Sequence, residues 1–338
     1  MPTTTIVSSG RRFDSEAGET LLDAALRQGI ALEHSCRTGR CSTCKSRVLS
    51  GQSVALHEEL GLAAADRAEG WVLSCVRSAS TDLVIEATDL GDMQLYPART
   101  WPCRVQAIEV LAEDVLKIVL RLPPSSDFAC HPGQYVDVFG PGGVRRSYSV
   151  ANATGADKLA ELHVKRVEGG VFSRYWFDHA KPGDLLRLRG PQGTFFLRGA
   201  QGLDLVFLAT GTGIAPVKAM LEGLAAGPAG QAGQAGQAPR TVTVYWGGRA
   251  PDSLYLDPGL ASAVTRYVPV LSRADASWQG ARGHVQEKFL ADAPDLGKTL
   301  VYACGSPAMI DSARAALQAA GLPPPRFHAD AFVSSAAT

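Results

Sequence analysis

The 338-residue chain lacks any apolar run of about eighteen residues, so no segment is expected to span a membrane. Its first residues, MPTTTIVSSGRRF, lack the apolar core of a secretion signal. It also lacks an excess of either charge, because 33 Lys and Arg balance 33 Asp and Glu, and no basic stripe points to nucleic acid. We therefore expect a cytoplasmic protein that binds neither membranes nor nucleic acids.

What the chain does have is an odd number of cysteines, seven, which argues against a closed set of disulfides and for a reducing compartment. Cys36, Cys41 and Cys44 lie within nine residues, and 30 residues separate Cys44 from Cys75. Four thiolates can surround two irons, and this spacing is the plant-type pattern for a [2Fe–2S] cluster. Gly39 would let the loop turn its N–H groups toward such a cluster.

Three other uses of crowded thiols compete with a cluster: a disulfide clip, a zinc site and a redox dithiol. Structural zinc usually takes two C-x2-C-like pairs, and only one is present. A thioredoxin-like dithiol would not need Cys36 or Cys75. The spacing therefore favours all four cysteines as ligands of one iron–sulfur cluster.

Three segments of different patterning follow one another. Residues 1–92 mix short β-like runs with one helical stretch, ETLLDAALRQGI, which predicts a small β-grasp domain before a Gly- and Pro-containing linker. Residues 100–200 hold closely spaced strands, which predict an antiparallel β-barrel. Residues 203–338 alternate strands and helices, which predicts a doubly wound parallel sheet. The Gly/Ala/Gln-rich insertion at 227–240 is expected to be a flexible surface loop.

The motifs, taken in order, resemble a known family. The loop CRTGRCSTC resembles that of plant-type ferredoxins, and HPGQYVDV, RRSYSVAN, GGVFS, GPQGTFF, GTGIAPVKAM, YWGGR, YACGSP and FHADAF together resemble the ferredoxin–NAD(P)H reductase superfamily. With the ferredoxin module in front, the chain is similar to the reductase components of bacterial oxygenases and to CDP-6-deoxy-glucoseen reductases. The resemblance implies a multidomain fold: a β-grasp ferredoxin (α+β), an antiparallel β-barrel that binds FAD, and an α/β doubly wound domain that binds NAD(P)H.

The middle segment contains candidate flavin ligands. In RRSYS, Arg146 and Tyr148 lie two residues apart, on one face of the predicted strand. Arg146 suits a pyrophosphate, Tyr148 can stack on the isoalloxazine ring, and Ser149 can hydrogen-bond near N5. An ordinary amphipathic strand with a surface Arg is the alternative.

Two further stretches of the middle segment belong to the candidate flavin site. The turn GGVFS is a candidate phosphate cradle formed by Gly170, Val171 and Ser173, the last at the start of a predicted helix. The resemblance also places three residues along the ribityl–adenine arm of the flavin: His163, Val164 and Lys165.

The last segment contains candidate nicotinamide ligands in a turn between a strand and a helix: Gly211, Thr212 and Gly213. The resemblance makes Ser149, Cys304 and Asp330 the candidate catalytic residues, with Cys304 approaching nicotinamide C4 and Asp330 lying with Phe332 beside the flavin. The alternative for Cys304 is a buried apolar cysteine without a catalytic role. The alternative for Asp330 and Phe332 is that they belong to a disordered tail.

The choice of nicotinamide depends on charge near the adenosine ribose. NADP recognition needs basic groups, whereas NAD recognition usually uses an acidic one. The stretch WGGRAPDSLY offers basic Arg249 and acidic Asp252, and LSRAD offers Ser272 and basic Arg273. A Ser-Arg pair at such a strand end can mean NADP, but many NADH users carry similar residues. We expect NADH as the donor, with NADPH as the alternative.

The expected activity is electron transfer from NAD(P)H through FAD and a [2Fe–2S] cluster to another protein. The expected acceptor is the terminal component of an oxygenase, and a pyridoxamine-dependent sugar dehydrase is the alternative. A zinc-stabilised interaction module without redox cofactors is a more distant hypothesis. We expect a monomer.

Overall fold

The computed structural model describes residues 1–155, 157–227, 238–258 and 262–333. It divides into two compact units, Met1–Leu95 and Tyr96–Thr338. The division lies inside the stretch predicted as a linker, and the finer domain boundaries stay predictions. Residues 228–237, most of the Gly/Ala/Gln-rich insertion, lie outside the described residues. In the described part of the chain, no helix has the length and apolar character needed to cross a membrane.

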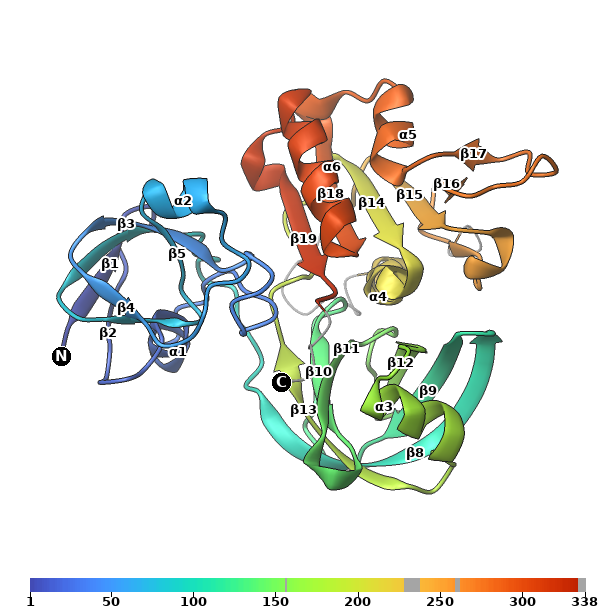
Figure 1. Cartoon of the computed structure of the whole chain (residues 1–338), viewed down its shortest axis with the longest axis horizontal. Helices are drawn as coiled ribbons and strands as arrows, with labels where there is room; N and C mark the ends of the chain where they lie inside the picture. Colours follow the sequence, from blue (N-terminus) through green and yellow to red (C-terminus); the bar gives the residue numbers. More distant parts are fainter. Residues whose placement is uncertain (156, 228–237, 259–261, 334–338) are drawn as a thin grey trace. The chain divides into compact units, whose positions relative to one another are not determined.

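The first unit packs the helix α1 (Leu21–Arg27) on a mixed sheet (Figure 1). Thr20 is the N-cap of the helix, and its hydroxyl accepts the Asp23 N–H at 3.0 Å; after the helix the chain turns away at Gly29, which has a φ of +74°. The predicted helix is thereby confirmed.

Five strands form the sheet of the first unit, in the order β2-β1-β7-β3-β5, with β1 parallel to β7. A separate two-stranded antiparallel sheet, β4-β6, and a short helix, α2, complete the unit. The elements are β1 (Thr3–Ile6), β2 (Arg12–Asp14), β3 (Lys45–Ser50), β4 (Ser53–Ala55), α2 (Ala64–Ala68), β5 (Trp71–Leu73), β6 (Arg77–Ala79) and β7 (Leu83–Glu86). This is the α+β arrangement of a β-grasp domain.

The second unit begins with six antiparallel strands in the order β11-β10-β13-β8-β9-β12. A bridge between Val150 and Leu162 joins the two outer strands, so the sheet closes into the predicted barrel. The elements are β8 (Arg99–Ala112), β9 (Val115–Arg121), β10 (Tyr135–Phe139), β11 (Arg145–Ser149), β12 (Leu159–Lys165), α3 (Val171–Arg174), a π-helical turn η2 (Tyr175–His179) and β13 (Leu185–Gln192).

The same unit continues into a six-stranded parallel sheet with the order β17-β16-β15-β14-β18-β19. The elements are β14 (Asp204–Thr210), the turn η3 (Gly211–Gly213), α4 (Ile214–Ala225), β15 (Thr241–Gly248), β16 (Arg266–Leu271), β17 (Ala281–Arg282), α5 (Val285–Ala291), β18 (Thr299–Gly305), α6 (Pro307–Ala319) and β19 (Phe327–Ala331). On one side of β14 the strands β15, β16 and β17 follow in chain order, and on its other side lie β18 and then β19. The point between β14 and β18 is therefore the topological switch point of a doubly wound sheet.

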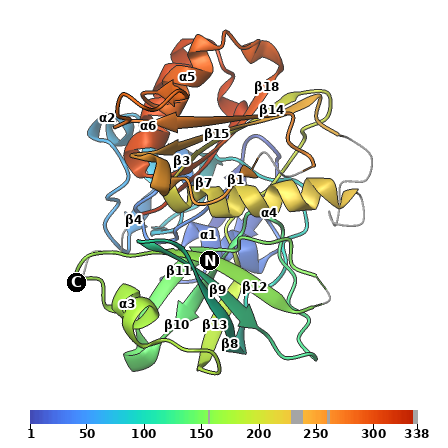
Figure 2. The same cartoon turned by 90° about the vertical axis from the view of Figure 1, so that its right-hand side faces the viewer.

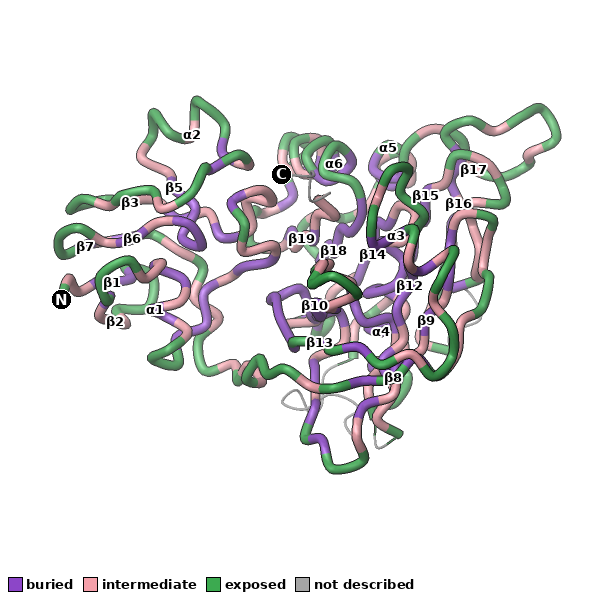
Figure 3. The backbone as a smooth tube through the Cα atoms, turned by 60° about the horizontal axis from the view of Figure 1, so that its bottom comes forward, coloured by how far each residue is buried: buried purple, intermediate pink, exposed green. Residues whose placement is uncertain are grey.

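The parallel sheet is buried on both faces, and Figure 3 shows β14 and β18 as mostly buried. On β14, Phe207 and Ala209 pack with α4, whereas Val206 and Leu208 pack with α5 and α6. Helix α4 lies between this sheet and the barrel, as Figure 2 shows. The helix that follows the Gly-rich turn is therefore also the helix that meets the barrel.

Candidate functional sites

The four predicted metal ligands come together in two pairs in the first unit. Cys41 donates a hydrogen bond from its thiol to Cys36, and Cys44 donates one to Cys75. Among the described residues, no group of three or more His, Cys, Asp or Glu side chains is arranged to hold a single metal ion. Two thiols for each of two irons is the donor set that a [2Fe–2S] cluster requires, so these residues fit the predicted group.

The backbone of the cysteine loop favours thiolates. The Thr38 N–H lies 3.4 Å from the sulfur of Cys36. The hydrogen bond from Cys41 and those from Thr38 lower the pKa of Cys36 to about 5. The hydrogen bond from Cys44, with another from the Gly39 N–H, lowers the pKa of Cys75. Backbone N–H groups therefore surround one thiol of each pair, as expected of a loop that stabilises negative sulfur.

Gly39 is needed in this loop for two reasons. Its φ is +72°, and a Cβ there would lie 2.4 Å from the carbonyl oxygen of Glu58. The next residue, Glu59, is buried and accepts hydrogen bonds from the Leu73 N–H at 2.7 Å and from Arg77 at 2.9 Å. Glu59 thus ties the segment over the cysteine loop to the strands that flank Cys75. Nothing in the sequence marks the contact between Glu59 and Arg77 except that the two residues carry opposite charges.

The candidate flavin residues lie on β11 of the barrel. Arg146 pairs with Val138 and Tyr148 with Val136, which places them on one face of the strand, as predicted. The Tyr148 hydroxyl accepts the Trp176 indole N–H at 3.1 Å. The Arg146 guanidinium bonds within the described residues only to the carbonyl of Arg145, so it keeps donors for an anion. Ser149 is buried at the end of the strand.

The GGVFS turn leads into α3, which begins at Val171, two residues earlier than predicted. Gly170 is the N-cap, and the Ser173 hydroxyl accepts the Val167 N–H at 2.8 Å. Ser173 is therefore in the first helical turn, and its oxygen holds the preceding turn in place.

The ribityl–adenine candidates lie on β12. Val164 is buried in the barrel core, and exposed Lys165 pairs with Asp114 at 2.9 Å. Both ring nitrogens of His163 are engaged, Nδ1 with the Tyr255 hydroxyl at 3.0 Å and Nε2 with Glu161 at 2.9 Å. The side chain of His163 is thus committed to protein contacts, and its backbone is the part that remains for a ligand.

The Gly-rich turn lies at the switch point of the parallel sheet. A Cβ on Gly213 would lie 2.2 Å from the carbonyl oxygen of Cys304, and one on Gly305 would lie 2.1 Å from the Thr210 hydroxyl oxygen. The carboxyl ends of β14 and β18 therefore approach each other as closely as backbone allows. In open α/β sheets, dinucleotides bind at this edge, against the N–H groups that begin the next helix.

Three more candidates meet at the same edge. Cys304 pairs in register with Asp330 on β19, and the Phe332 N–H donates to the carbonyl of Gly305 at 2.8 Å. Burial, reinforced by the Asp330 carboxylate, raises the pKa of Cys304 well above its usual value. Its side chain is fully buried on the α4 face of β18. The thiol is therefore protonated at neutral pH.

Arg249 and Arg273 lie side by side after β15 and β16. The Arg273 N–H donates to the Arg249 carbonyl at 3.0 Å, and both residues are exposed. Within the described part of the chain, neither guanidinium has a hydrogen bond or an ion pair. Two neighbouring free guanidinium groups suit a phosphate.

The barrel and the parallel sheet meet through polar residues that the sequence analysis did not single out. Lys218 of α4 bonds to Glu161 of β12 at 3.1 Å and to the carbonyl of Ala151 at 3.1 Å. Glu222, one turn later, accepts the Ala153 N–H at 2.9 Å. The only sequence signal was the Lys and Glu at i and i+4 on an otherwise apolar helix.

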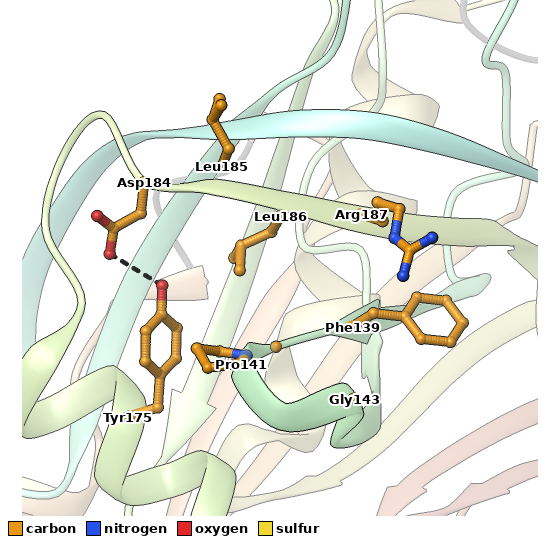
Figure 4. Close-up of a pocket in the computed structure, with 9 residues that line it drawn as sticks. Phe139, Pro141, Gly143, Tyr175, Asp184, Leu185, Leu186 and Arg187 are labelled. Atoms are coloured by element: carbon orange, nitrogen blue, oxygen red, sulfur yellow. Dashed lines mark hydrogen bonds between the residues drawn. The ribbon is translucent and has the colours of Figure 1, made fainter.

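A separate hollow of about 530 Å³ opens in the barrel at the Phe139 end of β10 (Figure 4). One wall carries a hydrogen bond from the Tyr175 hydroxyl to Asp184 at 2.9 Å. None of the predicted site residues lines it; the lining residues are Phe139, Gly140, Pro141, Gly143, Tyr175, Asp184, Leu185, Leu186 and Arg187.

A paired-thiol β-grasp unit, a closed barrel and a doubly wound sheet together define a modular electron-transfer reductase. Family models match all three parts: a 2Fe-2S iron-sulfur cluster binding domain at residues 4–80, an oxidoreductase FAD-binding domain at 102–197 and an oxidoreductase NAD-binding domain at 207–315. The protein is thus an oxidoreductase that uses NAD(P)H, FAD and a [2Fe–2S] cluster.

Comparison with known proteins shows which reductases of this class the chain is similar to. The chain is 41% identical over 331 residues to CDP-6-deoxy-L-threo-D-glycero-4-hexulose-3-dehydrase reductase of Yersinia pestis, covering 97% of each chain. It is 35% identical to the aromatic O-demethylase reductase subunit of an Amycolatopsis species, covering 96% of each. The crystal structure of the Amycolatopsis cytochrome P450 reductase GcoB matches with a TM-score of 0.75 and 32% identity over 99% of each chain.

The chain therefore belongs to the family of reductase components that pass electrons from NAD(P)H through FAD and a [2Fe–2S] cluster to a terminal protein. The predicted fold class, cofactors and electron-transfer activity are confirmed.

Proposed function

We propose that the chain receives electrons from NADH at the switch point of the parallel sheet and delivers them to a separate terminal protein from the cysteine loop of its first unit. The observation that carries this is the pairing of four thiols in a unit of its own, apart in sequence from the dinucleotide turn. When bound, the flavin supplies the conversion of a two-electron hydride donor into single-electron steps. The residues of the chain supply binding and orientation.

The residue roles are part of this proposal. Cys36, Cys41, Cys44 and Cys75 hold the cluster. Arg146 offers its guanidinium to the flavin pyrophosphate, and Tyr148 offers its ring face to the isoalloxazine. Ser149 offers a hydroxyl near flavin N5. The N–H groups of the remaining flavin candidates line its phosphate and ribityl arm: His163, Val164, Lys165, Gly170, Val171 and Ser173.

At the dinucleotide edge, the N–H groups after β14 bind the pyrophosphate from Gly211, Thr212 and Gly213. The close approach of β14 to β18 places the backbone of Cys304 beside this turn, which supports a role for Cys304 in positioning the nicotinamide. Asp330 and Phe332, at the end of the neighbouring strand, would border the flavin ring. A cytoplasmic, monomeric state belongs to the same proposal.

The first candidate acceptor is the terminal component of an oxygenase. Relatives of this kind include reductase components of an aromatic O-demethylase, propane 2-monooxygenase and phenol 2-monooxygenase, at 33–35% identity. A sugar dehydrase is the second candidate, and the observation that favours it is the higher identity of 41% to a hexulose-3-dehydrase reductase.

One spectrum and one reconstitution test the proposal. The purified protein should show flavin bands and a visible charge-transfer envelope that NADH bleaches under anaerobic conditions. Adding a purified oxygenase terminal component or a pyridoxamine-dependent dehydrase should then couple NADH oxidation to product formation with one of the two. A protein that contains zinc and lacks flavin bands would contradict the proposal.

NADH should be the preferred donor. Arg249 and Arg273 are exposed after β15 and β16, and they are the basic candidates that would contact the 2′-phosphate when NADPH is the donor. We expect kcat/KM for NADH to exceed that for NADPH, and the double change Arg249→Ala and Arg273→Ala to lower kcat/KM for NADPH by about tenfold or more. Steady-state ferricyanide reduction with each donor measures this. An equal loss with both donors would contradict a role limited to the 2′-phosphate.

A further inference from the structure

His163 of the barrel and Tyr255 of the dinucleotide half form a contact between the two halves of the second unit. The Tyr255 hydroxyl and His163 Nδ1 lie 3.0 Å apart, and the two rings meet edge to face with centroids 5.4 Å apart. The other ring nitrogen of His163 lies 2.9 Å from Glu161. His163 is buried, so this contact is shielded from water.

The direction of the hydrogen bonds follows from charge. His163 and Lys218 bond to Glu161 and lower its pKa despite its burial, so it is a carboxylate and can only accept. Nε2 of His163 therefore carries a proton and donates to Glu161. Burial raises the pKa of Tyr255 well above its usual value, so its hydroxyl keeps its proton and shares a hydrogen bond with Nδ1. Every polar atom of the pair has a partner.

Tyr255 also leads to the Gly-rich turn. Its ring packs edge to face on Trp246, with centroids 5.1 Å apart, and Trp246 is fully buried in β15. The Trp246 indole N–H donates to the carbonyl oxygen of Gly211 at 3.0 Å. A chain of direct contacts thus runs from barrel strand β12 to the first glycine of the turn.

The second connection between the halves arrives at the same turn. Lys218 bonds to Glu161 and to the carbonyl of Ala151, and it belongs to α4, which begins directly after Gly213. The turn is therefore held from both of its ends, by α4 on one side and by Trp246 on the other. Because protein interiors leave little free volume, we expect the turn, α4 and Trp246 to move together as one body.

We propose that His163 and Tyr255 are a positioning pair for hydride transfer: through Trp246, they hold the dinucleotide turn in register with the barrel strand that carries the flavin ligands. This inference rests on the proposed function. Hydride transfer depends steeply on the placement of the two reacting atoms, whereas binding of the dinucleotide to its own turn does not need the barrel. The pair should therefore control the rate of transfer more than the affinity for NADH.

The test is Tyr255→Phe, which removes the hydroxyl and keeps the ring on Trp246. Tyr245→Phe is the matched control, because Tyr245 donates to Asp292 at 2.7 Å entirely within the dinucleotide half. Each variant is mixed anaerobically with NADH as the holoenzyme, and flavin bleaching is followed. We expect the limiting rate of Tyr255→Phe to fall about tenfold, as the loss of one buried hydrogen bond allows, with apparent Kd for NADH changed less than twofold. Tyr245→Phe should reduce at the unaltered rate.

A double variant separates positioning from general damage. Because His163 and Tyr255 share one hydrogen bond, His163→Gln with Tyr255→Phe should be no slower than the slower single variant. Losses that multiply, an equal loss in Tyr245→Phe, or a normal rate in Tyr255→Phe would each overturn the proposal. Failure of the proposed function is a different result, since the unaltered protein would then show no NADH-dependent flavin bleaching at all.

Discussion

Cys41→Ser should remove the electron outlet and leave the electron inlet intact. We expect the variant to lose the visible charge-transfer envelope, to keep its FAD, and to reduce ferricyanide with NADH at close to the unaltered rate. Its NADH-driven reduction of cytochrome c or of the terminal protein should fall by about a hundredfold or more. The physical reason is that iron in such clusters is held by thiolates, and Cys41 is one of the two thiols in its pair.

The organisation of the chain makes the two activities separable. The four candidate cluster ligands lie in the first compact unit, and the candidate flavin and dinucleotide residues all lie in the second. Damage to the first unit therefore leaves the second unit's core untouched. Cys130→Ser is the matched control, because Cys130 is a buried thiol of the barrel, 3.4 Å from the Thr154 hydroxyl.

The measurement compares the three proteins side by side by absorbance, iron content and two turnover assays. Cys130→Ser should keep both iron and cytochrome c reduction. If Cys41→Ser lost ferricyanide and cytochrome c reduction to the same extent, a separate cluster step would be contradicted. If cytochrome c reduction survived without iron, the outlet would lie elsewhere.

Much of this arrangement follows from local sequence. Helix α1 could be predicted because its apolar residues recur at helical spacing and Gly29 ends it. The grouping of the cysteines could be predicted because three of the four lie in one loop, where spacing constrains geometry. The Gly-rich turn could be predicted because it follows a buried strand and opens a helix.

The rest depends on contacts between distant segments. The spacing does not reveal which thiols pair, and in the structure Cys44 of the loop pairs with Cys75, which lies in the turn between β5 and β6. The ion pair of Lys218 with Glu161 exists only because α4 docks on the barrel. Cys304 lies on the α4 face of β18, and TLVYACG cannot reveal this because a strand buried on both faces has no polar alternation.

Gly213→Ala should be the most damaging small change in the dinucleotide half. The new Cβ would lie 2.2 Å from the Cys304 carbonyl oxygen and 2.6 Å from its carbonyl carbon, both backbone atoms that cannot rotate away. The turn must therefore shift, and overpacking of this kind costs about 1–3 kcal/mol of stability. Because a displacement of about 1 Å can cost a hundredfold in rate, we expect flavin reduction by NADH to slow by about that factor.

Gly202→Ala is the control for the cost of replacing a glycine in general. Gly202 has a φ of +66° in an exposed turn, and a Cβ there would meet nothing within 4 Å. That variant should lose about 1 kcal/mol of stability and keep its NADH kinetics, since only local backbone strain is added. Dithionite, which bypasses the dinucleotide turn, should reduce flavin and cluster fully in both variants. If Gly213→Ala instead bleached its flavin with NADH as fast as Gly202→Ala, the close approach of β14 and β18 would not be where the dinucleotide binds.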